Sequence, residues 1–279
     1  MSLKLDQRQR ALLAEMGVRV WLPRAKGAPE SIAAEKARAP VEKAAPARTP
    51  PPARPASPPV PASVPMPAAA PAGAALGPRP EGVASMDWPA LEATVAGCRA
   101  CGLCAQRTQT VFGVGSRAAD WMVVGEAPGD NEDRQGQPFV GQAGKLLDNM
   151  LAAIGLSRQA TEETPVAGKQ GVYIANVLKC RPPGNRNPQP EEVAQCEPYL
   201  RRQVELVQPR IILAMGRFAV QSLLQTTEPI GRLRGRVHQY RGVPVIVTYH
   251  PAYLLRALPE KAKAWQDLCL ALKVAGGPA

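Results

Sequence analysis

The sequence predicts an α/β fold in which helices cover both faces of a mostly parallel sheet. Three observations support this: short apolar runs of strand length, longer segments with helical spacing of apolar residues, and turn-rich loops between them. All three lie within residues 86–279, where the two kinds of element alternate. We therefore expect this part to form one domain, long enough to bury a hydrophobic core.

The elements of this domain follow one another in a regular order. Asp87 before Trp88 and Pro89 indicates a helix start, because Asp caps the first turn and Pro is tolerated in it. The apolar run at residues 120–124 ends at Gly125 and is typical of a buried strand. Further strands are expected at residues 172–178, 209–214, 237–240 and 243–248, and further helices at residues 141–154, 191–207, 218–224 and 259–274.

Three polar, turn-rich segments follow predicted strands. They are residues 125–130, residues 176–186 and residues 248–251, and the last contains His250, one of only two histidines in the chain. Ligands of such folds bind beyond the carboxyl ends of the strands. The three segments are therefore expected to meet at one edge of the sheet and to form a site.

The segment before this domain has a different composition. Residues 40–80 contain 14 prolines and 12 alanines, and no aromatic residue occurs between Trp21 and Trp88. Such a sequence buries too little apolar surface to fold, so we expect residues 23–85 to be a disordered linker. Residues 1–22 precede it as a separate short amphipathic peptide, in which residues 6–22 carry a helical pattern.

The net charge of +11 is concentrated in the N-terminal part. Residues 1–80 hold 12 Lys and Arg against 5 Asp and Glu, and the remainder holds 22 against 18. A basic tail suits a polyanionic partner such as nucleic acid, and it equally suits a tail that only improves solubility. Residues 55–78 are uncharged but contain eight prolines, which argues against a membrane-spanning helix. With no signal-peptide pattern at the N-terminus, we expect a cytoplasmic, monomeric protein without a membrane partner.

The cysteines indicate a metal site. Cys98 and Cys101 form a C-x2-C pair, and Cys180 and Cys196 lie 16 positions apart far downstream. In an intracellular protein two such loops are expected to converge on a site with four thiolates, for which zinc and an iron–sulfur cluster are both allowed. Cys104 is a competing ligand, whereas Cys269 lies in a helical pattern typical of a buried, inert thiol.

Three segments together resemble the family 4 uracil-DNA glycosylases, the iron–sulfur branch of their superfamily. They are GEAPGDNEDRQGQPFVGQAGKLLDNML, YIANVLKCRPPGNRNPQPEEVAQC and YHPAYLLR. The resemblance covers the chain from Cys98 onward. It implies a three-layer α/β/α sandwich, a structural [4Fe–4S] cluster bound by Cys98, Cys101, Cys180 and Cys196, and monofunctional removal of uracil from single- or double-stranded DNA in base excision repair, with nucleoid association during repair.

The resemblance also implies roles for individual residues. Phe139 matches the residue that stacks on the flipped uracil, and Asn176 matches the residue that reads it. A carboxamide fits uracil because its NH2 group meets O4 while its C=O meets N3–H. His250 matches the histidine that stabilises negative charge on uracil O2.

The loop from Gly125 to Gly129 is expected to supply groups to uracil and to the attacking water. Glu126 and Glu132 are candidate catalytic carboxylates, and Glu132 is also a candidate to exclude the methyl group of thymine. Family 1 enzymes carry an aspartate where this chain has Ala127, so that carboxylate is unavailable here.

DNA contacts are expected at two places. The segment Tyr253 to Arg256 implies an apolar wedge of Leu254 and Leu255 and a phosphate contact from Arg256. The loop from Arg181 to Arg186 is expected to add phosphate contacts from these two arginines.

Other interpretations remain open for the tail and for the activity. Residues 6–22 weakly resemble the N-terminal segment of the psi subunit of bacterial DNA polymerase III, which implies a partner in the replication machinery. Alternatively, they form an extra helix packed on the domain. For the activity, the alternatives are the superfamily branch that stays covalently joined to the abasic sugar, whose characteristic insert is absent here, and a non-catalytic DNA-binding accessory protein.

Overall fold

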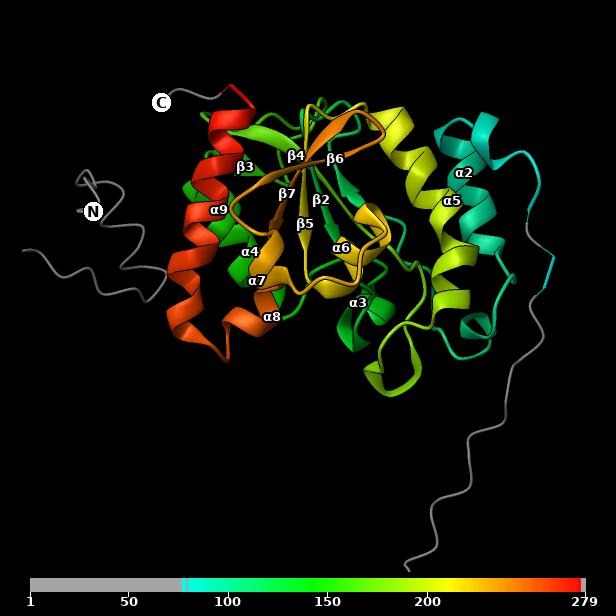
Figure 1. The fold of residues 1–279 in the computed structure, drawn as a ribbon. Coiled ribbons are helices and arrows are strands. Elements are labelled where there is room, and N and C mark those ends of the chain that lie inside the picture. Colours follow the sequence, from blue (N-terminus) through cyan, green and yellow to red (C-terminus); the bar gives the residue numbers. More distant parts are fainter. Residues whose placement is uncertain (1–76, 79, 277–279) are drawn as a thin grey trace, which may run out of the picture. The chain divides into compact units, whose positions relative to one another are not determined.

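The computed structural model describes residues 77–78 and 80–276 of the chain (Figure 1). The predicted peptide at residues 1–22 and nearly all of the predicted linker lie outside the described residues, so both stay predictions. Within the described part, no helix is both long and apolar enough to cross a membrane.

The centre of the domain is a sheet with the strand order β1-β4-β2-β5-β7-β6. Its four central strands run parallel: β4 (Gln170–Asn176), β2 (Trp121–Gly125), β5 (Ile211–Met215) and β7 (Val243–Thr248). The antiparallel edges are β1 (Val114–Gly115) and β6 (Val237–Tyr240), and the short β3 (Leu156–Ser157) pairs with the start of β4. A mostly parallel sheet was predicted, and it is confirmed.

Helices cover both faces of this sheet. Because side chains alternate along a strand, Trp121 and Val123 of β2 pack into one cluster with α4 (Gln142–Ala153) and α9 (Lys261–Val274). Met122 and Val124 pack into a second cluster with α5 (Pro190–Val207) and α6 (Arg217–Leu224). Figure 1 shows α4 and α9 on one side and α5 on the other, with α2 (Trp88–Gly97) packed outside α5. The predicted three-layer α/β/α sandwich is confirmed.

A third cluster joins α2 to the cysteine-bearing loops. Leu91 and Val95 of α2 pack with Leu178, Tyr199 and three buried cysteines, Cys101, Cys180 and Cys196. Val83, in the 3-10 helix η1 (Val83–Ser85), belongs to the same cluster, so buried contacts begin upstream of residue 86.

Most predicted elements are found within a few residues of their expected bounds. Asp87 Oδ1 accepts a hydrogen bond from Ala90 N at 3.0 Å, which confirms the predicted helix start. The elements that the prediction lacked are one to two turns long or shorter, below the length at which apolar periodicity is readable. They include α3 (Asp130–Gln135), α7 (Ile230–Leu233), α8 (Pro251–Leu254) and the 3-10 helices η2 (Gly102–Ala105), η3 (Pro183–Asn185) and η4 (Leu258–Glu260).

Candidate active site and cysteine cavity

A cleft of about 680 Å³ opens at the carboxyl edge of the sheet. Asn176 is the last residue of β4, Glu126 follows β2, Arg217 follows β5 and His250 follows β7, and all four line the cleft. Three of these strand ends were predicted to meet. The fourth, at Gly216 and Arg217, was missed, although the same rule applied to the predicted strand at residues 209–214 would have found it.

Phe139 lines the cleft and lies close to Gly125, the last residue of β2. The Phe139 ring lies nearly parallel to the His250 ring, with centroids 5.3 Å apart and an interplanar angle of 25°. A Cβ atom on Gly125 would collide with both Asn176 Oδ1 and the Phe139 ring. Glycine at position 125 therefore allows Asn176 and Phe139, the residues predicted to recognise and to stack on the base, to lie next to each other.

The side chain of Asn176 has an unmet hydrogen-bonding requirement. It is 2% exposed, and Oδ1 has no hydrogen-bond partner among the described residues. A buried, unpaired polar atom costs free energy, so it marks a place where a ligand donor is needed. Since Asn176 also lines the cleft, this donor would come from a molecule bound there.

The backbone of Asn176 is fixed by a lysine that the sequence analysis missed. Lys179 is fully buried, and its Nζ donates to Asn176 O at 2.8 Å, Gln203 Oε1 at 2.6 Å and Phe112 O at 3.3 Å. Burial lowers the pKa of this ammonium group to about 7. No pattern in the sequence distinguishes Lys179 from a surface lysine, because its three acceptors come from distant segments.

His250 is oriented by the helix that follows it. Its Nδ1 accepts a hydrogen bond from Ala252 N at 3.2 Å at the start of α8, so in the neutral ring the proton sits on Nε2. The pKa of His250 is lowered to about 4, chiefly by burial; Glu132 opposes this shift and Arg256 adds to it. The ring is therefore a neutral hydrogen-bond donor at physiological pH.

The Glu126 carboxylate faces the cleft and is anchored at one oxygen. Oε1 accepts from Phe218 N at 3.0 Å, in the first turn of α6. Burial raises the pKa of Glu126. The backbone N–H groups of Phe218 and Arg217 and the charge of Arg217 oppose this rise. A Cβ atom on Gly216 would lie 2.5 Å from Oε1, so only glycine leaves room for this carboxylate.

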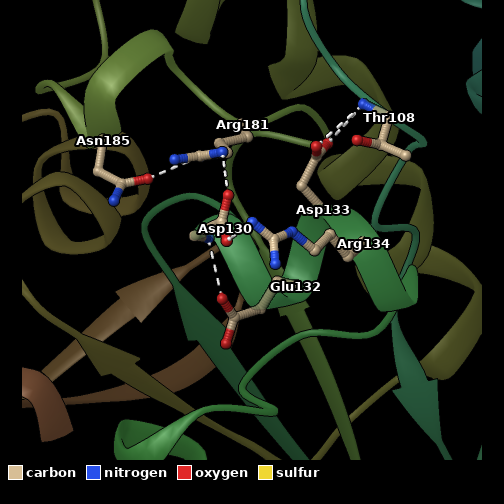
Figure 2. A network of polar contacts seen from close by, with 8 residues as sticks. Thr108, Asp130, Glu132, Asp133, Arg134, Arg181 and Asn185 are labelled. Atoms are coloured by element: carbon tan, nitrogen blue, oxygen red, sulfur yellow. Dashed lines mark hydrogen bonds and ion pairs between the residues drawn. The ribbon is translucent and has the colours of Figure 1, made fainter.

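Glu132 ties two segments of the cleft wall together. Its carboxylate accepts from Gly129 N at 3.1 Å, Val140 N at 3.0 Å and Gly141 N at 3.3 Å, and the first of these is drawn in Figure 2. The loop after β2 and the segment carrying Phe139 are thereby held by one side chain. This geometry favours a structural clamp over the predicted catalytic role.

Two of the predicted phosphate-binding arginines are engaged within the protein. Arg181 pairs with Asp130 at 2.6 Å and donates to Asn185 Oδ1 at 2.8 Å, and Asp130 also pairs with Arg134 (Figure 2). Arg186 makes two hydrogen bonds to the buried carboxylate of Glu192, at 3.0 and 2.5 Å. These pairs shape the loop that lines the cleft. Arg256, by contrast, lines the cleft with no acid at ion-pair distance in the part of the chain that is described.

The position of Leu254 argues against its predicted contact with DNA. Its side chain is 0% exposed and packs in the core cluster that contains α4 and α9. Leu254 is the last residue of the one-turn helix α8, which starts next to the sheet, and its side chain therefore points into the core. Tyr253 and Leu255, each 41% exposed, are the apolar side chains of this segment that reach the surface.

The cysteines predicted as ligands come together in a second, small cavity. Cys98, Cys101, Cys180 and Cys196 line it, as does Cys104. Arg107 Nη1 donates to Cys180 Sγ at 3.1 Å. Among the described residues, no three His, Cys, Asp or Glu side chains are arranged to hold a single metal ion. Cys269 is apart from this cavity, partly buried against the cluster that contains α9.

Comparison with known proteins places the chain in a family. Residues 112–269 match the model of the uracil DNA glycosylase superfamily. A type-4 uracil-DNA glycosylase of Archaeoglobus fulgidus is 47% identical over 166 residues, which are 57% of this chain and 78% of that protein. One from Pyrobaculum aerophilum is 38% identical over 193 residues, covering 66% and 93%.

The chain belongs to the type-4 uracil-DNA glycosylases. The predicted resemblance is thereby confirmed. A type-5 uracil-DNA glycosylase of Pyrobaculum aerophilum matches as well, at 36% identity, but over only 48% of this chain and 61% of that protein. In this type-4 glycosylase, the superfamily match includes the whole cleft edge from Gly125 to Arg256 and begins downstream of Cys98 and Cys101.

Proposed function

We propose that the protein excises uracil from DNA by hydrolysing the N-glycosidic bond and leaves an abasic site for base excision repair. One observation carries this proposal. Asn176 Oδ1, which is buried and has no partner among the described residues, lines the same cleft as His250, whose neutral ring carries its proton on Nε2. Together they match the hydrogen-bonding pattern of a uracil ring that becomes an anion.

Recognition begins when the nucleotide leaves the base stack, because its glycosidic bond is inaccessible within a duplex. Phe139 supplies an apolar ring in the cleft on which the base stacks. Asn176 Oδ1 accepts the N3–H of uracil, and its amide NH2 donates to O4. Cytosine has an acceptor at N3 and a donor at position 4, so it would leave these buried groups unpaired.

Bond cleavage sends the bonding electrons of C1′–N1 into the uracil ring, where negative charge develops on O2. The Nε2–H of His250 stabilises this charge as a preorganised donor. Water then adds to C1′, and the proton that it loses balances the charge of the departing uracil anion. Glu126 is the candidate to orient this water, because backbone N–H groups hold Oε1 while the carboxylate lines the cleft.

The side chains that line the small cavity suit a [4Fe–4S] cluster by their chemistry. Its five thiols come from two distant segments, residues 98–104 and 180–196, and Arg107 donates to one of the sulfur atoms. Each thiolate of such a cluster binds a different iron, so the ligands are not spaced as they would be around a single ion. Cys98, Cys101, Cys180 and Cys196 would hold the cluster, whose contribution is to cross-link these segments.

Further parts of the proposal concern partners and location. The proposed substrate is uracil-containing DNA, single- or double-stranded, bound by a cytoplasmic monomer that associates with the nucleoid during repair. A replication-machinery partner for residues 6–22 belongs to the same proposal, on the basis of the sequence pattern alone.

The test is strand scission of an oligonucleotide with a single uracil after treatment with protein and hot alkali. The wild type is expected to give cleavage that depends on alkali. His250→Ala is expected to lower the rate by about 10²- to 10³-fold, the usual cost of losing one donor to a developing oxyanion. His238→Gln is the matched control, because His238 bonds to Leu233 O from the edge strand β6 and does not line the cleft.

Two outcomes would contradict this proposal. Absence of uracil release by folded wild type would remove the enzymatic function. Cleavage without alkali would show a lyase and not a monofunctional glycosylase.

A further inference from the structure

Arg217 presents an exposed guanidinium group to the cleft at a place that the sequence analysis did not identify. It is the first residue of α6, directly after β5, and it lines the cleft. Its Cζ lies 4.5 Å from the centroid of the Phe218 ring, so the guanidinium group packs against the aromatic side chain that follows it. Over the described ranges of the chain, no acid lies at ion-pair distance from it.

The strand order puts Arg217 in the path of the substrate. Along the sheet edge the order is β4, β2, β5 and β7, which carry Asn176, Glu126, Arg217 and His250 at or just after their ends. A nucleotide that meets both Asn176 and His250 spans the end of β5, which lies between them. Its sugar and phosphate therefore pass near Arg217.

The distribution of charge in the cleft favours a phosphate at this position. Arg181 and Arg186 are each engaged in an ion pair, with Asp130 and with Glu192. The Glu132 carboxylate binds three backbone N–H groups, and Glu126 is anchored by α6. Arg217 lowers the pKa of Glu126 through space but forms no ion pair with it within 4.0 Å, so its N–H donors are directed to no carboxylate there.

We propose that Arg217 binds a phosphate of the DNA strand beside the flipped nucleotide and, with Arg256, grips the backbone from two neighbouring strand ends. This inference rests on the proposed function, since it assumes a nucleotide in the cleft. It assigns the binding of DNA phosphate to Arg217 in place of the internally paired Arg181 and Arg186. Arginine suits the task because its planar fork matches two phosphate oxygens.

The first experiment measures binding of a fluorescent single-stranded oligonucleotide with one abasic analogue, by anisotropy, at several salt concentrations. Arg217→Gln is expected to weaken binding and to reduce the slope of log affinity against log salt by about 0.7, the value for one lost phosphate contact on a single strand. The control is Arg210→Gln. Arg210 is equally exposed but precedes β5, so it lies at the opposite edge of the sheet. The slope of log affinity against log salt for Arg210→Gln is expected to equal that of the wild type.

The second experiment replaces single phosphates around the abasic analogue by neutral methylphosphonate. At one position the replacement is expected to weaken wild-type binding and to have no further effect on Arg217→Gln. This pattern identifies a phosphodiester of the strand, whereas displacement by free inorganic phosphate alone would not depend on position.

Other results would overturn the proposal. An unchanged salt slope in Arg217→Gln, or losses that add at every methylphosphonate position, would exclude a direct phosphate contact. If Arg217→Gln shifted the pH–rate profile but left DNA binding unchanged, the role of Arg217 would be to lower the pKa of Glu126 and not to bind phosphate. Binding to the abasic analogue requires no uracil release, so failure of the proposed catalytic function is recognised separately.

Discussion

The chemistry of His250 is set by one backbone contact and by its burial. Ala252 N donates to Nδ1, so the neutral ring carries its proton on Nε2, and burial keeps the ring neutral. A cationic imidazolium would be a stronger donor but would be costly to bury. The site therefore provides a hydrogen bond without requiring a charge.

The lowered pKa of His250 should make the stability of the folded protein depend on pH. A histidine in the unfolded chain takes up its proton near pH 6.5, whereas His250 in the folded protein resists protonation until about pH 4. Its contribution to stability is therefore complete above pH 6.5 and is lost as the pH falls from 6.5 towards 4. NMR titration of the ring signals measures this directly, because the chain has only two histidines and His238→Gln leaves one. A His250 midpoint near 6.5 would contradict the neutral-donor mechanism.

Short helices at the carboxyl edge decide which residues meet the substrate. Helix α8 is one turn long, and it directs Leu254 into the core while Leu255 stays at the surface. Adjacent leucines in one motif thus have different tasks. We assign the proposed DNA wedge to Leu255, beside Tyr253, whose ring packs against Tyr249.

The two leucines give a matched pair of variants at the scale of this element. Leu254→Ala leaves a cavity in the core and is expected to lower the free energy of unfolding by about 2–5 kcal/mol. Leu255→Ala is expected to change it by less than about 0.5 kcal/mol, as is usual for surface positions, and to slow uracil release from duplex DNA more than from single strands. Urea denaturation and rates on the two substrates measure both effects. Equal destabilisation by the two changes would contradict the assignment.

At the scale of the whole molecule, one segment connects the cleft to the cysteine cavity. Asn176 and Cys180 are four positions apart, and Lys179 between them joins this segment to Gln203 of α5 and to Phe112. Val177 N and Leu178 N bond to Gly125 O and Glu126 O at the end of β2. The proposed cluster would therefore stabilise a segment whose other end carries Asn176, the residue proposed to bind the base.

The cluster proposal predicts different roles for two neighbouring cysteines. Cys98→Ser is expected to lower the iron content and the visible absorbance of the purified protein, because a ligand is lost. Cys104→Ser is expected to retain both, although Cys104 lines the same cavity. The spectrum also separates the two metals that the sequence left open, since zinc is colourless. If Cys104→Ser lost iron while Cys98→Ser retained it, Cys104 would be the ligand and Cys98 would not.

Periodicity and local turn chemistry predicted the larger part of the fold. Strands such as β2 and β7 and helices such as α4 and α5 each bury a complete face, so their apolar patterns are readable from local sequence. Motif resemblance identified the residues that line the cleft from three strand ends. Lys179 and the internal partners of Arg181 and Arg186 could not be predicted in this way, because their roles depend on residues far away in the sequence.

The alternating α/β order, the sheet edge that carries the cleft and the convergence of the cysteines could all be predicted from local sequence. These properties follow from patterns of a few neighbouring residues and from connection rules that hold for all parallel sheets. Which side chains are free to bind a ligand depends instead on how the elements pack together. Burial turned Leu254 inward, ion pairs engaged Arg181 and Arg186, and backbone N–H groups engaged Glu132. Burial and pairing are properties of the packed chain, because each partner is supplied by another element of the fold.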